Sequence, residues 1–458
     1  MSQTTTAGGA PVIDIGHALD QGPFTALQKG VIFLCAMAIV LDGFDGQLIG
    51  FAIPMIIKEW GITRAAFAPA VASGLIGMAV GMAMAGSIAD RIGRRLVLAF
   101  SVLLFGAATV AIGFSPDVET IIALRFVAGL GIGGALPSCS TMTAEYAPAR
   151  SRTMAVTISI VCFPLGGMLA GLFAGWVLPT YGWRALFWIG GAIPMAFSLV
   201  LFAFLPESPR FLARQRQRWQ ELVKLLNRLE RPTPANAEFT DSLEAAASAN
   251  AKQAVGMKGL FTSDYARDTI GLWLAFFMVV LSLYSAYSWL PTMLTSEGLP
   301  VSLASQGLTA YNVGGVVGSL LCALIVNRFG SRIPMIIMAL LAGIVAIAMM
   351  GIDTKQDTQM LITGFGIHGL FVSASQVLLY ALCAYVYPTS IRATGTAMAL
   401  AVGRGGGIVS AFIGAAVITA AGANGFLTLL AVGMFGSAFA LMLIKRHIPP
   451  VSGRITKV

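Results

Sequence analysis

Long apolar stretches separated by short polar connections run along almost the whole chain. A helix needs about 20 apolar residues to cross the hydrocarbon core of a bilayer, and twelve stretches have this character. The pattern therefore predicts an all-α membrane protein with twelve transmembrane helices. Their approximate centres are Val40, Gly77, Leu104, Leu130, Gly166, Pro194, Met278, Val316, Leu341, Phe371, Ile408 and Val432.

One long polar segment, residues 206–268, interrupts this pattern between the sixth and the seventh stretch. Its middle, Trp219–Leu229, predicts a helix, and the segment divides the chain into two halves of six helices. The expected parts are an N-terminal tail (1–26), a first half (27–205), a central loop (206–268), a second half (269–446) and a C-terminal tail (447–458).

Composition and charge agree with a membrane protein. Hydrophobic residues make up 57% of the chain and charged residues 11%, whereas soluble domains are about 25% charged. On one predicted side of the membrane only Lys58, Arg64, Arg184 and Lys355 are basic. The other side, with the central loop, holds the remaining basic residues, so we expect both termini in the cytoplasm. This asymmetry, rather than nucleic-acid binding, explains the net charge of +9.

Signals for export, metals and cofactors are not found in the sequence. Residues 1–21 contain no Lys or Arg, so we expect no signal peptide, and the first apolar stretch serves for insertion. The five cysteines lie in or beside apolar stretches, and the three histidines, His17, His368 and His447, are far apart in the chain. We therefore expect no metal, no cofactor and no enzymatic activity.

Two motifs repeat between the halves. Asp90-Arg91-Ile92-Gly93-Arg94-Arg95 follows the second stretch and Asn327-Arg328-Phe329-Gly330-Ser331-Arg332 follows the eighth, an offset of 237 residues (328 − 91). Pro148 and Arg152 recur as Pro388 and Arg392, an offset of 240 residues (388 − 148). The repeat predicts a parallel duplication of six helices, with a substrate site near the membrane midplane between the halves.

Several motifs resemble those of known transporters. The loop Gly86–Arg95 resembles the signature of the major facilitator superfamily, and Pro206–Phe211 is similar to a motif of sugar porters and their relatives. Asp42-Gly43-Phe44-Asp45, the glycine-rich run Arg125–Ala135 and Gly403-Arg404-Gly405-Gly406 together resemble the aromatic acid:proton symporters. The resemblance runs from about Ile13 to the end of the last predicted helix.

This resemblance implies a function. It suggests a proton-coupled importer of an aromatic carboxylic acid, such as 4-hydroxybenzoate, protocatechuate or a related benzoate, that works by alternating access as a monomer in the bacterial inner membrane. Symport of another small organic acid or of a sugar-like solute remains the alternative. A membrane-embedded enzyme and a non-transporting sensor are further alternatives, but no catalytic constellation or appended domain supports them.

Asp42 and Asp45 lie in the middle of the first apolar stretch. A carboxylate at the centre of a membrane helix costs about 2.5–3.5 kcal/mol, so a pair of them indicates a function. Three residues apart, they share one helix face and are expected to titrate as a coupled pair, as a proton carrier requires. The alternative is that one aspartate only balances a nearby arginine.

Arg125 is a third charge deep in an apolar helix. Glu145 on the same helix is 20 residues away (145 − 125), about 30 Å along the axis, and cannot be its partner. Asp42 or Asp45 is the natural counter-charge. The interaction is then either a coupling switch, broken by substrate or by a proton, or a purely structural ion pair.

Arg404 belongs to one half only, since Pro164 stands 240 residues before it. A guanidinium can bind a carboxylate bidentately, so Arg404 is the candidate for the substrate's carboxylate. It could instead cap backbone carbonyls or pair with another helix. A neutral sugar would not need this charge, which favours an organic anion. An inside-negative potential opposes anion import by about 2.3 kcal/mol per 100 mV, and one co-transported proton cancels that charge.

The tenth predicted helix carries His368, Gln376 and Tyr380 on broadly one face. Gln376 could bind a ring hydroxyl, and His368 is either a binding residue or a satisfied core residue. Tyr284, Tyr287 and Tyr311 could stack on an aromatic ring, or they could serve as interfacial side chains. Trp289, beside Pro291, is expected in the interfacial aromatic belt.

Charged residues in the cytoplasmic connections could form a gate that breaks and re-forms between conformers. A short basic turn that fixes the topology is the simpler alternative. The second copy has Asn327 in place of the aspartate, so the halves are not expected to contribute equally. The candidates are Asp90, Arg91, Arg94, Arg95, Glu145, Arg152, Arg328 and Arg392.

Overall fold

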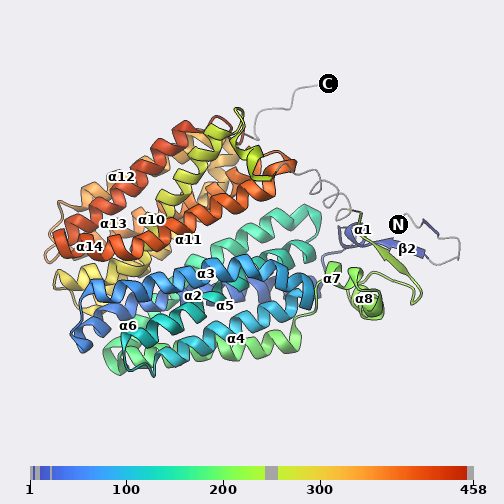
Figure 1. Ribbon diagram of the computed structural model, residues 1–458, viewed down its shortest axis with the longest axis horizontal. Coiled ribbons are helices and arrows are strands. Elements are labelled where there is room, and N and C mark those ends of the chain that lie inside the picture. The colour runs from blue at the N-terminus through green and yellow to red at the C-terminus, as the bar shows by residue number, and fades with distance from the viewer. Residues whose placement is uncertain (1–3, 6–10, 21–22, 243–255, 451–458) are drawn as a thin grey trace.

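Long helices dominate the computed structural model, which describes residues 4–5, 11–20, 23–242 and 256–450 (Figure 1). Ten of them are long and apolar enough to cross a membrane. They are α2 (Ala26–Trp60), α3 (Arg64–Ile92), α4 (Arg94–Ile112), α5 (Val118–Tyr146), α6 (Ala149–Phe204), α10 (Ala266–Ser296), α11 (Val301–Phe329), α12 (Arg332–Met349), α13 (Thr358–Val386) and α14 (Thr389–Leu443).

Two of these helices are each long enough for two spans. Helix α6 has 56 residues and α14 has 55, which would extend about 84 Å at 1.5 Å per residue against a core of about 30 Å. Both are interrupted by glycine with a positive φ, Gly182 at 77° and Gly422 at 55°. Eight single spans and two double ones agree with the twelve predicted, and the predicted all-α membrane fold is confirmed.

The spans form two bundles, α2–α6 and α10–α14, which lie one below the other in Figure 1. Glycines bring the helices of the first bundle into backbone contact. A Cβ at Gly77 of α3 would overlap the carbonyl oxygen of Phe126, and one at Gly129 of α5 would overlap that of Gly74. Small residues at such positions are typical of membrane helix packing, and here they bring Arg125 of α5 close against α3.

Short elements gather at one end of the bundles. They are β1 (Thr4–Thr5), β2 (Pro11–Asp14), α1 (Ile15–Asp20), α7 (Pro209–Arg214), η1 (Arg216–Arg218), α8 (Trp219–Arg228), β3 (Glu238–Thr240) and η2 (Gly256–Phe261). Helix α8 is the helix predicted in the central loop. The strands were not predicted: β2 pairs with β1 in antiparallel fashion, Val12 opposite Thr4, and with β3 in parallel, Val12 opposite Glu238.

The N-terminal segment is thereby tied to the central loop. Arg231, just after α8, donates hydrogen bonds to the carbonyl oxygens of Ala18 and Leu19 at the end of α1. We call the end of the bundles that carries these elements the α8 end, and the opposite end, with the connections after Trp60 and Met349, the far end.

Candidate functional site

Asp42 and Asp45 lie in the middle of α2 and are almost completely buried, at 2% and 0% exposure. Among the described residues, Oδ1 of Asp42 and both carboxylate oxygens of Asp45 have no hydrogen-bond partner. Each aspartate interacts electrostatically with a different arginine, Asp42 with Arg404 and Asp45 with Arg125. The pair therefore connects two arginines that come from different halves of the chain.

Arg125 fits against α3 because residue 74 is glycine. A Cβ at Gly74 would lie only 2.9 Å from Nη2 of Arg125. Arg125 is 5% exposed, and its charge interacts with Asp45. Of the two counter-charges left open by the sequence, Asp45 is the one that the structure favours. Thr109 of α4 also neighbours Asp45.

Arg404 reaches from the second half across to the first. Its Nη1 donates a hydrogen bond to Oη of Tyr284 at 2.6 Å and lies 2.9 Å from Sδ of Met78, in α3 of the other half. The glycines around Arg404 let α14 approach α10 closely: a Cβ at Gly406 would overlap the carbonyl oxygen of Phe277. Arg404 is thus a half-buried cation at the boundary between the halves, rather than a cap on backbone carbonyls.

A small enclosed cavity lies at the same level between the halves. Its volume is about 20 Å³, enough for about one water molecule, so in this conformation the halves are closed around it. Both halves contribute to its walls: Gly46, Gln47, Ile49, Val71, Leu75, Met78, Arg125 and Phe163 from the first, and Tyr284, Tyr287 and Ser288 from the second. We call it the central cavity.

A row of rings leads away from the central cavity into the second half. The ring centroids of Tyr284 and Tyr287, of Tyr287 and Tyr311, and of Tyr311 and His368 are each 5.8 Å apart. His368 is fully buried, and neither ring nitrogen has a partner among the described residues. It lies behind Tyr311 and is not among the residues that line the central cavity.

Gln376 and Tyr380 lie on the Arg404 side of the second half. Nε2 of Gln376 donates to Oη of Tyr380 at 3.4 Å, and the Tyr380 ring packs edge-on against Phe276 at 5.6 Å. Tyr380 also interacts electrostatically with Arg404. Gln376, Tyr380 and Arg404 therefore form one polar group. The amide oxygen of Gln376 has no hydrogen-bond partner among the described residues.

The predicted gate residues of the first half form a network at the α8 end. Arg94 contacts Glu145, which also accepts a hydrogen bond from Ser208. Glu207 accepts from the backbone nitrogens of Arg94 at 2.9 Å and Arg95 at 3.1 Å. Glu207 and Ser208 are not among the predicted site residues, although they belong to the Pro206–Phe211 motif that resembles one of the sugar porters.

The other gate candidates have different contacts. Asp90 pairs with Arg214 at 3.4 Å, Arg152 contacts Asp20, and Arg91 is exposed. In the second half, Arg328 lies over the ring of Phe329, and Arg392 donates to the carbonyl oxygen of Tyr387 at 3.1 Å. Among the described residues, the first-half candidates thus form ion pairs within their half, with the N-terminal tail and with the central loop, through Glu145, Asp20 and Arg214 respectively.

One sequence-based expectation is wrong. Trp289 is not in an interfacial belt, because its side chain is 0% exposed and packs against Gly414 of α14. A residue larger than glycine at 414 would leave no space for the indole. Trp289 is therefore part of the core of the second half.

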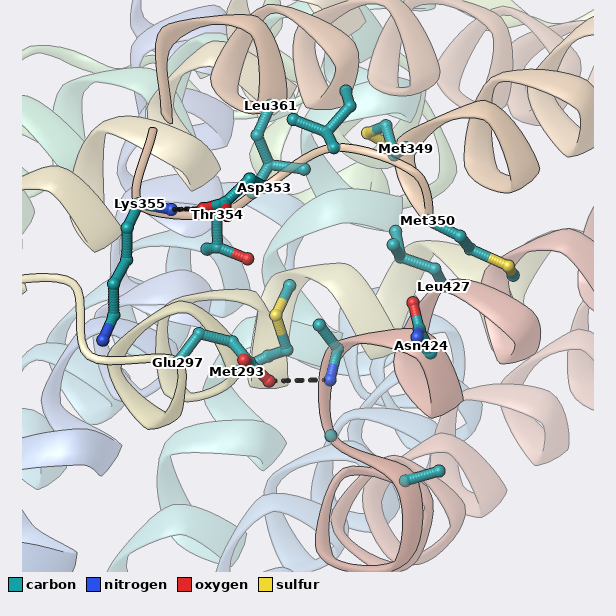
Figure 2. A pocket seen from close by; sticks show the side chains of 14 residues that line it. Met293, Glu297, Met349, Met350, Asp353, Thr354, Lys355, Leu361, Asn424 and Leu427 are labelled. Atoms are coloured by element: carbon teal, nitrogen blue, oxygen red, sulfur yellow. Dashed lines mark hydrogen bonds between the residues drawn. The ribbon is translucent and has the colours of Figure 1, made fainter. Parts of the chain in front are cut away.

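A wider hollow of about 500 Å³ lies at the far end of the second half, separate from the central cavity (Figure 2). It is lined by residues at the end of α10, in the α12–α13 connection and at the break in α14. Oε1 of Glu297 accepts a hydrogen bond from the backbone nitrogen of Ala423 at 2.9 Å, which fastens the break in α14 to α10.

Comparison with known proteins agrees with this architecture. The sequence profile described as Major Facilitator Superfamily matches residues 35–350 and 272–457, so the chain belongs to that superfamily of membrane transporters. It is 32% identical to a gallate transporter of Pseudomonas putida, over 94% of each chain. It is 34% identical to the 4-hydroxybenzoate transporter PcaK of Pseudomonas putida, over 89% of this chain and 90% of that one.

The fold is also found among solved structures. An inward-open structure of the xylose transporter XylE from E. coli superposes with a TM-score of 0.72 over 92% of this chain and 97% of that one, at 20% identity. At that identity the likeness shows the shared fold.

Proposed function

We propose that this protein is a proton-coupled importer of an aromatic carboxylic acid of the 4-hydroxybenzoate, protocatechuate or gallate type. The observation that carries the proposal is the juxtaposition of Arg404 and Asp42 at the boundary between the halves. Arg404 can bind a substrate carboxylate, and it interacts electrostatically with Asp42, which can bind a proton. The similarity to the gallate and 4-hydroxybenzoate transporters supports the aromatic class.

The anion site is built on Arg404. Tyr284 orients one guanidinium nitrogen at 2.6 Å. The other two guanidinium nitrogens donate no hydrogen bond to the described residues, and a guanidinium can bind a carboxylate in a planar fork. The rings of Tyr284 and Tyr287 line the central cavity, where they can pack against the flat ring of the substrate once the halves move apart and the cavity widens. The Gln376–Tyr380 group is the candidate for contacts with polar ring substituents.

Substrate binding and proton binding are coupled because the substrate carboxylate and Asp42 compete for Arg404. Without substrate, the charge of Asp42 interacts with that of Arg404. A bound carboxylate satisfies Arg404 in place of Asp42, so anion binding and proton binding at Asp42 favour each other. This is reciprocal linkage between two ligands. Asp45 with Arg125 forms a second titratable unit in the first half, through which the proton can leave.

The α8 end is assigned to the cytoplasm. The basic residues of the connections at that end support this orientation, and both chain ends then face the cytoplasm of a bacterial inner membrane. The contacts found between the halves, such as Arg404–Met78 and Gln47–Asn312, lie between the middle of the bundles and the far end. The conformation is accordingly closed toward the outside, and we propose that one chain carries the complete transport unit.

Uptake by purified protein in liposomes tests this function. Radiolabelled 4-hydroxybenzoate should accumulate when the outside is made more acidic, up to about tenfold for one pH unit with one proton per anion, since tenfold corresponds to 1.4 kcal/mol. Labelled xylose, tested in the same liposomes, should not accumulate. Gradient-stimulated uptake of xylose, without uptake of any aromatic acid, would contradict the proposal and support the sugar alternative.

A further inference from the structure

Gln47 of α2 and Asn312 of α11 form a buried amide pair across the two halves. Nε2 of Gln47 donates to Oδ1 of Asn312 at 3.1 Å, and Nδ2 of Asn312 donates to Oε1 of Gln47 at 2.8 Å. Nδ2 of Asn312 also donates to the carbonyl oxygen of Leu308 at 3.0 Å. The side chains are 1% and 0% exposed, so every polar atom of the pair depends on this arrangement.

The pair lies in a layer where the halves touch without space for extra atoms. A Cβ at Gly167 of α6 would collide with both amide groups. A Cβ at Gly50 of α2 would overlap the carbonyl oxygen of Tyr287 of α10, and one at Gly171 would meet Oγ1 of Thr309. Gln47 and Tyr287 of this layer also line the central cavity, so the layer lies beside that cavity and on the far-end side of the Arg404–Met78 contact.

We propose that Gln47 and Asn312 form an amide clasp that holds the two halves together beside the central cavity and must open before a substrate can reach Arg404 from outside. The proposal rests on the alternating-access function proposed above and adds the residues of the outer gate. Two neutral amides can hold the halves together at this depth without the desolvation cost of an ion pair. They also cannot titrate, so the clasp responds to proton and substrate only through the movement of the helices.

The position of Gln47 on α2 suggests how that movement is transmitted. Gln47 follows Asp45 by two residues on the same helix, so a shift of α2 that accompanies a change at Asp45 also displaces the Gln47 amide. Once the halves separate, each amide needs water or another partner, because an unpaired buried amide is unfavourable. The clasp therefore favours two states, fully paired or opened to water.

Access to the cavity from outside tests the clasp. Met78 lines the central cavity and contacts Arg404, so a Met78→Cys variant reports access to Arg404 from outside. In intact cells a small membrane-impermeant thiol reagent should label this cysteine slowly. The single change Asn312→Leu leaves Gln47 buried and unpaired, and should speed labelling about tenfold, the factor given by losing about 1.4 kcal/mol of hydrogen bonding.

The double variant Gln47→Met/Asn312→Leu is the second arm. Apolar groups of similar shape replace both amides, so folding is retained while no polar atom is left unpaired. Labelling in the double variant should be slower than in Asn312→Leu, because the unpaired amide is removed. The exposed Asn424, changed to Ala, is the matched control and should leave labelling at the parent rate. The protein without Met78→Cys gives the background of the five buried native cysteines.

The outcomes separate the clasp from the proposed function. Faster labelling in Asn312→Leu, in protein that elutes and melts as a folded carrier, supports the clasp even where no aromatic acid is transported. Unchanged labelling in both clasp variants overturns it. If those variants also take up 4-hydroxybenzoate normally, the function stands and the amide pair serves only for packing.

Discussion

Replacing Arg404 by lysine tests whether substrate binding needs only a positive charge or also the planar set of donors that a guanidinium provides. Lysine keeps the positive charge but presents one ammonium instead of a planar set of donors. In the structure one guanidinium nitrogen is already committed to Tyr284 at 2.6 Å, so the substrate carboxylate must use the others. Arg404→Lys therefore cannot hold both Tyr284 and a carboxylate in the same geometry.

The expected change in the Kd follows from the hydrogen bonds to the carboxylate that each substitution removes. A hydrogen bond to a charged group contributes about 1.5–3 kcal/mol, so losing one of two bonds to the carboxylate should raise the Kd about ten- to hundredfold. Tyr284→Phe removes only the group that orients Arg404 and should raise the Kd less, about three- to tenfold, for a loss of about 0.5–1.5 kcal/mol. The exposed Arg216, changed to Lys, is the control and should leave the Kd unchanged.

Calorimetric titration of purified protein measures these constants. 4-Hydroxybenzoate should be compared with its uncharged amide, which has the same ring but no carboxylate. The parent protein should prefer the acid strongly, and Arg404→Met should lose that preference. An unchanged Kd in Arg404→Lys, or a full preference for the acid in Arg404→Met, would show that Arg404 does not bind the carboxylate.

Two further predictions concern the first half. Asp42→Asn and Asp45→Asn should each abolish accumulation of substrate in liposomes while at least one still exchanges preloaded substrate, because exchange needs no net proton movement; parental accumulation in both variants would remove the proton site from this pair. Gly74→Ala places a Cβ 2.9 Å from Nη2 of Arg125, so uptake should fall severalfold at an unchanged melting temperature, whereas Gly30→Ala, where a Cβ meets no atom within 4 Å, should transport normally.

The membrane fold could be predicted from the sequence because it depends on local properties. About 20 apolar residues suffice for one span, and the repeat at an offset of about 240 residues marks the two halves. The strands β1–β3 were not predicted, because segments of two to four residues pair only through contacts distant in the chain. The hydropathy pattern already predicts two spans in each of α6 and α14, and Gly182 and Gly422 interrupt these helices between the predicted spans.

The individual site residues could be predicted better than their partners. Buried charges such as Asp42, Asp45 and Arg404 are conspicuous in an apolar sequence, since each is costly in a membrane. The Gln47–Asn312 pair was missed because neutral amides are not unusual and 265 residues separate them. Trp289 was misplaced because its burial depends on Gly414 of another helix, which no local pattern reveals.

Simultaneous recording of proton and substrate movement tests the coupled mechanism most directly. Purified protein is placed in liposomes that contain a pH-sensitive dye, and labelled 4-hydroxybenzoate is added outside. Substrate uptake should acidify the interior in step with accumulation, beyond the rate in protein-free liposomes, and Asp45→Asn should abolish both signals. Protein-dependent accumulation of 4-hydroxybenzoate at an unchanged internal pH would contradict proton-coupled import.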